Sequence, residues 1–115
     1  MMPKGPEGRI YLAMGATDMR KAINGLSILV QQKFGLNPLG ADYFVFCNRR
    51  RTLVKMLYWD RNGFCLWQKR LEKHRFRWPR TEEEVLQIER RQLSWLLAGL
   101  DIRQAHEELR YERIV

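Results

Sequence analysis

The sequence predicts an α+β fold, in which an antiparallel meander sheet of about four to five strands packs against a helix at residues 18–34. Short apolar runs between residues 43 and 78 are joined by turns too short for parallel crossovers. Apolar residues recur at three- and four-residue steps from Met19 to Phe34, which is the pattern of one helix face. A second stripe, from Leu93 to Leu100, predicts a C-terminal helix near residues 89–98.

The N-terminal part is expected to begin with a loose arm at residues 1–8, which holds two prolines and two glycines. The apolar run at residues 9–14 predicts a short strand. The helix after it is expected to be capped by Thr17 or Asp18, because either side-chain oxygen accepts bonds from the free amides of a first turn. Gly35 is its expected C-terminal stop.

The predicted antiparallel meander begins at residue 43. Asp60 and Gly63 bound its clearest turn, because Asp bonds nearby amides and Gly accepts a positive φ. Apolar side chains fall on both faces of its second strand. One face is therefore expected to pack on the 18–34 helix, and the other on the C-terminal part or on a partner. The strands are predicted at residues 43–47, 52–59, 64–71 and 76–78.

Two structures are compatible with residues 81–100. The stretch from Thr81 to Glu84 matches a capping box, which would start one long helix to Leu100. Alternatively, residues 85–88 are extended and a helix at 89–98 follows, with Gly99 as its stop. Residues 103–115 are predicted to form an irregular tail, and the chain of 115 residues is expected to be a single domain.

The composition indicates a basic protein of a reducing compartment. The net charge is +8 and the sequence pI is about 10.0. Cys47 and Cys65 lie in apolar runs with no CxxC pattern, so buried free thiols are predicted, with a Cys47–Cys65 disulfide as the alternative. Because neither a signal-peptide pattern nor a run of about 18 apolar residues occurs, a cytoplasmic protein without membrane association is expected.

Residues 49–80 concentrate the positive charge. They hold eleven of the twenty-one Lys and Arg residues against two acids, Asp60 and Glu72. Cations this close together repel one another, and nucleic acid is the commonest partner that compensates such a charge. The predicted nucleic-acid-binding residues are Arg49, Arg50, Arg51, Lys55, Arg61, Lys69, Arg70, Lys73, Arg75, Arg77 and Arg80.

Two arrangements within this segment favour phosphate contact. The triplet Arg49–Arg51 lies in a predicted turn, from which guanidinium groups reach phosphate oxygens without disturbing a core. Arg75 and Arg77 alternate with Phe76 and Trp78, so cations and rings face opposite ways. Protection of a sheet edge is an alternative use of such charges. The tryptophans of the segment are either core residues or a stacking surface for bases: Trp59, Trp67 and Trp78.

A second anion site is predicted at the start of the 18–34 helix, where Arg20 and Lys21 fall in the first turn. The helix dipole makes this an unfavourable place for cations, and such a departure can mark a bound anion. Asp18 partly offsets the charge, so an ordinary helix start is the alternative.

No catalytic or metal-binding pattern is found. A nuclease or transposase core needs several carboxylates that converge on a divalent metal ion. A cap and a turn already explain Asp18 and Asp60, and His74 and His106 have no partner at ligand spacing. The prediction is a protein that is not an enzyme and needs no cofactor or metal.

Several motifs in residues 9–103 keep the order of a known family. They are Tyr11-Leu-Ala with Thr17-Asp-Met-Arg-Lys21, Phe44-Val-Phe46 before the arginine triplet, Lys55-Met-Leu-Tyr-Trp-Asp60, Gly63-Phe-Cys-Leu-Trp67 leading into Lys69-Arg-Leu-Glu72, Phe76-x-Trp78-Pro79, and Gln92-Leu93 through Leu97-x-Gly99-x-Asp101. In these motifs the chain resembles the TnpB (Orf2) accessory proteins of the bacterial insertion-sequence family numbered 66. It does not match the longer RNA-guided nuclease that shares the name TnpB.

The resemblance implies a small protein that is encoded beside a larger, catalytic transposase and is needed for transposition, with no catalytic residues to carry over. Its implied partners are DNA, the transposase and the other accessory protein of the same element. The resemblance also favours an extended 85–88 followed by a helix. Glu89-Arg90 stand where the family usually has a Thr-Pro helix start.

Three functions stay open at this point. The first is a non-catalytic accessory protein for DNA transposition that binds DNA through a basic surface, and the charge favours it. The second is an adaptor that docks on the transposase through exposed tryptophans without binding DNA. The third is a general RNA-binding module that uses aromatic stacking.

Overall fold

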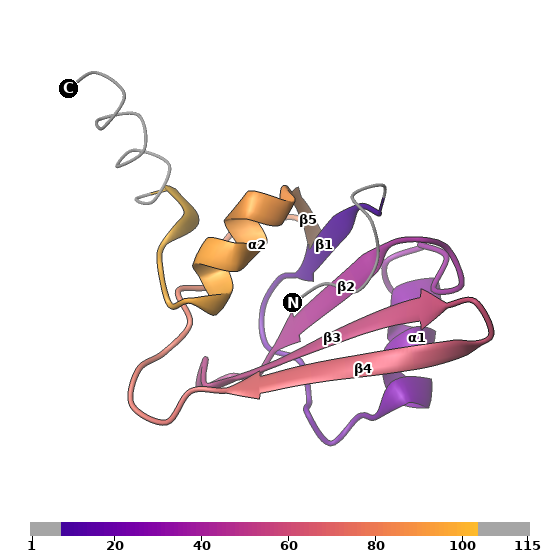
Figure 1. The fold of residues 1–115 in the computed structure, drawn as a ribbon, viewed down its shortest axis with the longest axis horizontal. Helices are drawn as coiled ribbons and strands as arrows, with labels where there is room; N and C mark the ends of the chain where they lie inside the picture. Colours follow the sequence, from indigo (N-terminus) through magenta and orange to yellow (C-terminus); the bar gives the residue numbers. More distant parts are fainter. Residues whose placement is uncertain (1–7, 104–115) are drawn as a thin grey trace.

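The computed structural model describes residues 8–103 as one five-stranded mixed sheet with a helix on each face (Figure 1). The predicted α+β fold is thus confirmed. Residues 1–7 and 104–115, which include most of the predicted arm and tail and also His106, lie outside the described residues. The elements are β1 (Ile10–Ala13), α1 (Ile23–Gln32), β2 (Tyr43–Cys47), β3 (Leu53–Asp60), β4 (Gly63–Arg70), β5 (Val85–Ile88) and α2 (Arg90–Leu97).

The sheet order is β4-β3-β2-β1-β5. The β2–β3–β4 part is the predicted antiparallel meander. The β1–β2 pair is parallel, with Ile10 opposite Tyr43, and α1 lies in the connection between the two strands. A parallel pair requires such a long crossover, whereas the meander needs only turns. On the other side of β1, β5 pairs antiparallel and brings Ile88 opposite Ile10.

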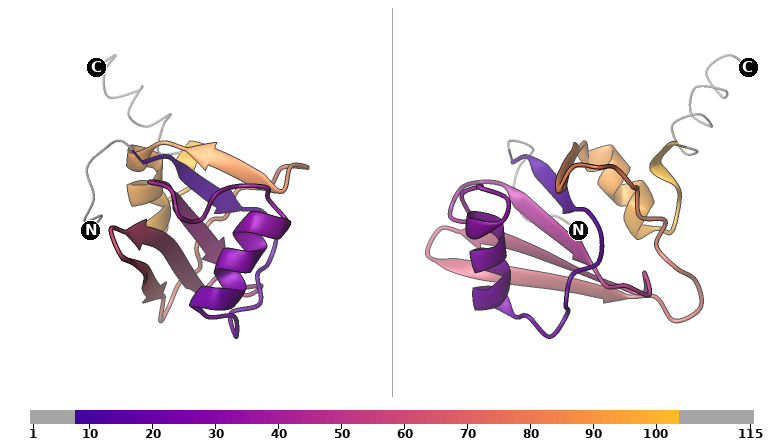
Figure 2. Two further views of the ribbon diagram at one scale, coloured as in Figure 1. Left: turned by 90° about the vertical axis from the view of Figure 1, so that its right-hand side faces the viewer. Right: turned by 180° about the vertical axis from the view of Figure 1, so that it is seen from behind.

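The two helices cover opposite faces of the sheet (Figure 2). On one face, Leu26 and Val30 of α1 pack in a cluster with Leu57. On the other face, Val54 and Met56, which belong to β3 as Leu57 does, pack in a cluster with the leucines of α2. Both faces of the sheet are therefore covered, as the apolar pattern of the second meander strand predicts. All five residues of β2 are buried for the same reason.

Helix α1 begins at Ile23, five residues later than predicted. Asp18 does not cap it. Instead, the Asp18 carboxylate accepts a hydrogen bond of 3.0 Å from the Arg20 backbone N–H, and the Lys21 N–H donates to the Asp18 carbonyl at 3.1 Å. These bonds close a separate turn ahead of the helix. The N-cap is Ala22, which has no side chain able to accept a bond.

Residues 76–78 do not form the predicted strand. They are an extended, irregular segment in which the Phe76 N–H donates to the Arg51 carbonyl at 2.7 Å. The alternation predicted there is still present, because Phe76 and Trp78 are buried while Arg75 and Arg77 are exposed.

Residues 85–88 are extended and a helix follows them, which confirms the second of the two structures predicted for residues 81–100. The Thr81 hydroxyl accepts only a local bond from the Glu83 N–H at 3.2 Å, and no helix starts there. Helix α2 begins at Arg90. Glu89 and Gln92 form a reciprocal capping box, which replaces the Thr-Pro start of the family.

Both cysteines are free thiols, as predicted. Cys47 is buried, and burial raises the pKa of its thiol. Cys65, on the edge strand β4, is only half-buried.

Candidate nucleic-acid interface

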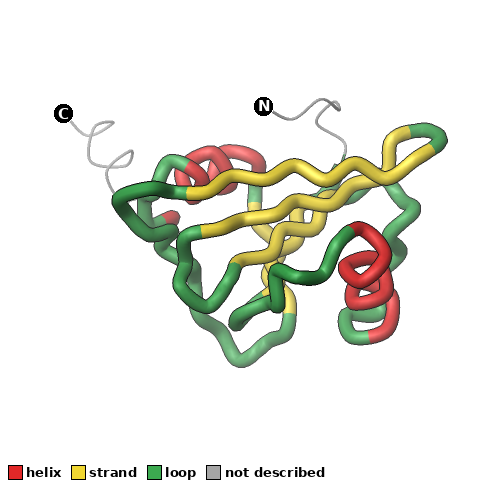
Figure 3. Tube along the Cα trace, turned by 90° about the horizontal axis from the view of Figure 1, so that it is seen from below, coloured by secondary structure: helices red, strands yellow, loops and turns green. Residues whose placement is uncertain are grey.

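Three loops meet at one end of the sheet (Figure 3). Strands β1, β2 and β4 end there, and β3 begins there. Hydrogen bonds tie the loops to one another and to the strand ends: Thr17 N–H to the Cys47 carbonyl at 2.9 Å, and Leu71 N–H to the Thr52 carbonyl at 2.8 Å. The loop at 14–22, the turn at 48–52 and the connection at 71–84 therefore form one surface.

Seven of the eleven predicted nucleic-acid-binding residues are exposed at this end. Two lie in the β2–β3 turn, and five lie at the end of β4 and in the connection after it. We call this set the basic end. It consists of Arg49, Arg50, Arg70, Lys73, Arg75, Arg77 and Arg80.

Three other predicted residues are half-buried, and each donates to a backbone carbonyl. Arg51 has a φ of 63° and donates from Nη1 to the Gly15 carbonyl at 3.1 Å. Lys55 Nζ donates to the Met19 and Lys21 carbonyls at 2.8 and 3.2 Å. Lys69 Nζ donates to the Leu97 carbonyl at the end of α2 at 2.8 Å. These cations hold loops and a helix end in place.

Arg61 lies apart from the basic end. It occupies the β3–β4 turn with a φ of 54°, at the opposite end of an eight-residue hairpin. At about 3.3 Å per residue, the hairpin separates Arg61 from the basic end by roughly 25 Å.

The predicted anion site at Arg20 and Lys21 is wrong in its premise, because neither residue lies in the first turn of a helix. Helix α1 begins at Ile23, and Arg20 instead forms an ion pair of 2.8 Å with Asp18. Hydrogen bonding from the Arg20 side chain and backbone lowers the pKa of the Asp18 carboxyl to about 2.

Acidic side chains limit the basic end on one side. Glu72 accepts from Arg70 at 3.3 Å within it. Glu82, Glu83 and Glu84, which follow Arg80 after one threonine, are exposed in the segment that leads to β5.

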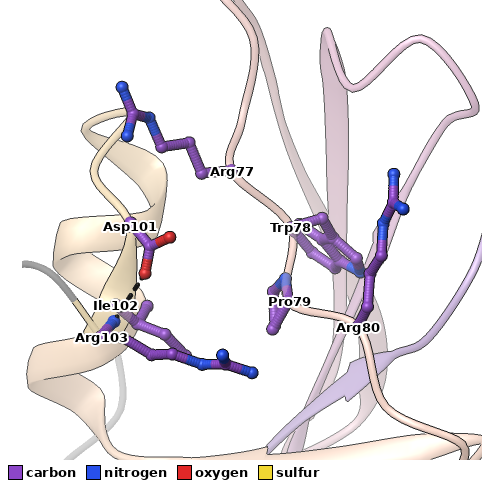
Figure 4. Close-up of a pocket in the computed structure, with 7 residues that line it drawn as sticks. All are labelled: Arg77, Trp78, Pro79, Arg80, Asp101, Ile102 and Arg103. Carbon is purple, nitrogen blue, oxygen red and sulfur yellow. Dashed lines mark hydrogen bonds between the residues drawn. The ribbon is translucent and has the colours of Figure 1, made fainter.

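A cavity with a volume of about 320 Å³ opens beside the basic end (Figure 4). It lies between residues 77–80 and 101–103. Arg77, Arg80 and Arg103 are among the residues that line it, and Asp101 accepts from the Arg103 backbone N–H at 2.8 Å. Sequence reasoning missed Arg103, because the charge pattern of residues 101–115 gives no sign that this residue packs beside residues 77–80.

The tryptophans occupy different environments. Trp78 is 7% exposed and donates from Nε1 to the Ala13 carbonyl at 2.9 Å, so it is a core residue. Trp67 is half-buried against the same core. Trp59 packs edge-on against Phe64, with ring centroids 5.0 Å apart, near the turn opposite the basic end. A fourth, Trp95 on α2, lies 5.9 Å from the Arg91 guanidinium and was not singled out by its sequence.

Among residues 8–103, no group of three or more His, Cys, Asp or Glu side chains is placed to hold a metal ion. Within the same residues, no helix has the length and apolar character needed to cross a membrane.

The fold and the site define a small α+β protein that gathers exposed cations in the loops at one end of its sheet. The chain belongs to the IS66 Orf2 like protein family, whose model matches residues 8–107. This membership implies an accessory role associated with transposition. The chain is 40% identical over 99% of both sequences to the uncharacterized protein y4hO of Sinorhizobium fredii. It is 36% identical to the uncharacterized protein y4jC of the same organism, over 81% of this chain and 80% of that relative. No solved structure matches it.

Replacing Lys55 with methionine is expected to lower stability and to leave DNA binding unchanged. The substitution keeps the apolar stem but removes the donor for the Met19 and Lys21 carbonyls, at a cost of about 1–3 kcal/mol. Urea denaturation measures the loss, and Lys33→Met, at an exposed position, is the matched control. Unchanged stability together with weaker DNA binding would show that Lys55 contacts the nucleic acid instead.

Proposed function

We propose that this protein is a non-catalytic accessory factor for DNA transposition that binds DNA through the basic end. The observation that carries the proposal is the convergence of seven exposed cations from two separate segments of the chain onto one surface. Such a surface neutralises several phosphates at once, and this is the dominant source of non-specific DNA affinity.

The proposed contacts are to the DNA backbone rather than to base edges. Six of the seven cations are exposed in loops, and both described helices pack against sheet faces through their buried residues. Sequence is read mainly by elements that enter a groove, whereas Arg and Lys contacts to phosphate set position and affinity. In the proposed role, this protein therefore positions DNA. Its further partners are the transposase and the other accessory protein of the element, which supply catalysis and the recognition of DNA sequence.

The test is a fluorescence-anisotropy titration of a labelled transposon-end duplex across a salt series. If about five phosphates are neutralised, the slope of log affinity against log salt is about −4 to −5. A random duplex of equal length is expected to bind with similar affinity. A single strand and an RNA of that length serve as comparisons.

Two results would overturn the proposal. Absence of binding at micromolar concentrations in low salt would exclude direct DNA binding by this protein, and a pull-down with the transposase would then test the adaptor function. Tighter binding to the RNA than to either duplex would favour the RNA-binding function.

A further inference from the structure

Strand β4 is an outer edge of the sheet, and no other described element pairs with it (Figure 1). The Leu71 N–H donates to the Thr52 carbonyl, which continues the β3–β4 ladder by one step. Backbone groups in an antiparallel ladder alternate in direction. The backbone N–H and C=O groups of the odd-numbered residues of β4 therefore point toward β3. Those that point outward, away from the sheet, belong to Phe64, Leu66, Gln68 and Arg70.

Over its first five residues, Gly63–Trp67, this edge lacks the features that usually prevent strand addition. Its eight residues pair with β3 in unbroken register, with no bulge and no proline, and Gly63–Trp67 carry no charge. Of its two cations, Lys69 is held by the Leu97 carbonyl. The opposite edge, β5, has only four residues and lies between Glu84 and Glu89. Short strands and flanking charges protect an edge, whereas β4 is twice as long as β5 and its first five residues carry no charge.

Apolar side chains are left half-exposed along both faces of β4. Phe64 and Leu66 lie at the rim of the core under α1, and Cys65 and Trp67 lie at the rim of the core under α2. A further strand beside β4 would extend both faces and cover these side chains, while pairing the outward backbone groups.

We propose that the edge pairs with β4 of a second copy of this chain, antiparallel and centred on Leu66. In this register Lys69 of each copy lies opposite Gly63 of the other, and Arg70 lies opposite Asn62. Parallel pairing in register would instead place the cations of the two copies side by side, which is destabilising. The antiparallel interface is self-complementary, as a two-fold dimer requires.

The dimer joins the two sheets into one sheet of ten strands. Its two-fold axis stands perpendicular to the sheet at Leu66, so β4 runs in opposite directions in the two copies. Because the basic end lies where β4 ends, the basic ends of the two copies face away from each other. The proposed dimer therefore has two separate cationic surfaces, one at each basic end.

Sedimentation equilibrium of the full chain, from about 1 to 200 µM, tests the dimer directly and does not depend on DNA binding. The monomer mass is 13.9 kDa, and we expect the mass to rise to twice that value within this range. Leu66→Lys, which places a charge at the centre of the interface, is expected to weaken association by at least about tenfold. The matched control is Leu39→Lys, at an exposed position in the α1–β2 loop, and it is expected to leave association unchanged.

A second variant keeps the test valid if Leu66→Lys impairs folding. Gln68→Pro removes an outward N–H that donates to no other described residue, and proline is tolerated in edge strands at such positions. Circular dichroism verifies that the variant is folded, and a shift toward the monomer is expected. A monomer at all concentrations, or a dimer that both folded variants leave equally tight, would overturn the proposal.

Discussion

Replacing Arg49, Arg50 and Arg75 together with glutamine is expected to weaken DNA binding about 10- to 100-fold near 100 mM salt and to make the salt slope shallower by about 3. All three side chains are exposed at the basic end. Arg51 is left intact, because it donates to the Gly15 carbonyl and its loss would disturb the loop. The three substitutions therefore remove proposed phosphate contacts without removing a described hydrogen bond.

The matched control changes Lys33, Arg61 and Arg91 to glutamine, which alters the net charge by the same amount. Arg61 lies at the far turn of the hairpin, and Lys33 and Arg91 follow the end of α1 and the start of α2. Salt titrations of both triple variants separate a localised interface from a general effect of charge. An equal loss of affinity in the two variants would mean that the basic end has no special role.

Replacing Trp78 with alanine is expected to lower the free energy of unfolding by about 3–5 kcal/mol, the usual range for a buried aromatic residue. Trp78 is 7% exposed, packs in the core under α2 and donates from Nε1 to the Ala13 carbonyl at 2.9 Å. This hydrogen bond links the connection at 71–84 to the end of β1. Trp78→Phe keeps much of the ring volume but loses the donor, so its expected cost is smaller, about 1–3 kcal/mol.

Urea denaturation of Trp78→Ala and Trp78→Phe measures both losses. DNA titration of folded Trp78→Phe is expected to give the wild-type affinity, because the ring faces the core. Normal stability together with lost affinity for single-stranded DNA would instead identify Trp78 as a stacking surface. Trp59→Ala, at a half-buried position near the far turn, is the comparison and is expected to cost less.

The meander was predictable because each of its pairings joins strands that are neighbours in the chain. Asp60 and Gly63 carry the turn signal between β3 and β4, and the register follows from that turn. The parallel β1–β2 pair joins residues about 33 positions apart, and no local pattern encodes it. The late start of α1 has a different cause: an Asp that caps a helix and an Asp that closes a separate turn have the same sequence signature.

The candidate site was predictable in location but not in composition. The charge density of residues 49–80 marks the segment, yet it does not distinguish a cation in solvent from one that binds a carbonyl. Lys55 and Lys69 donate to carbonyls 28–36 positions away in the chain, so only the tertiary structure reveals their role. The same holds for Arg103, which the fold brings beside residues 77–80.

The position of β1 between β2 and β5 has a consequence for synthesis on the ribosome. Of the five described strands it is the first to be made, but its outer neighbour β5 ends at Ile88, about 75 residues after Ala13. At roughly 5–20 residues per second, translation of that interval takes about 4–15 s. Throughout it the outer side of β1 has no partner and the core under α2 lacks Leu93, Leu96 and Leu97. A nascent chain in this state exposes the apolar residues of the sheet face that α2 covers in the folded protein.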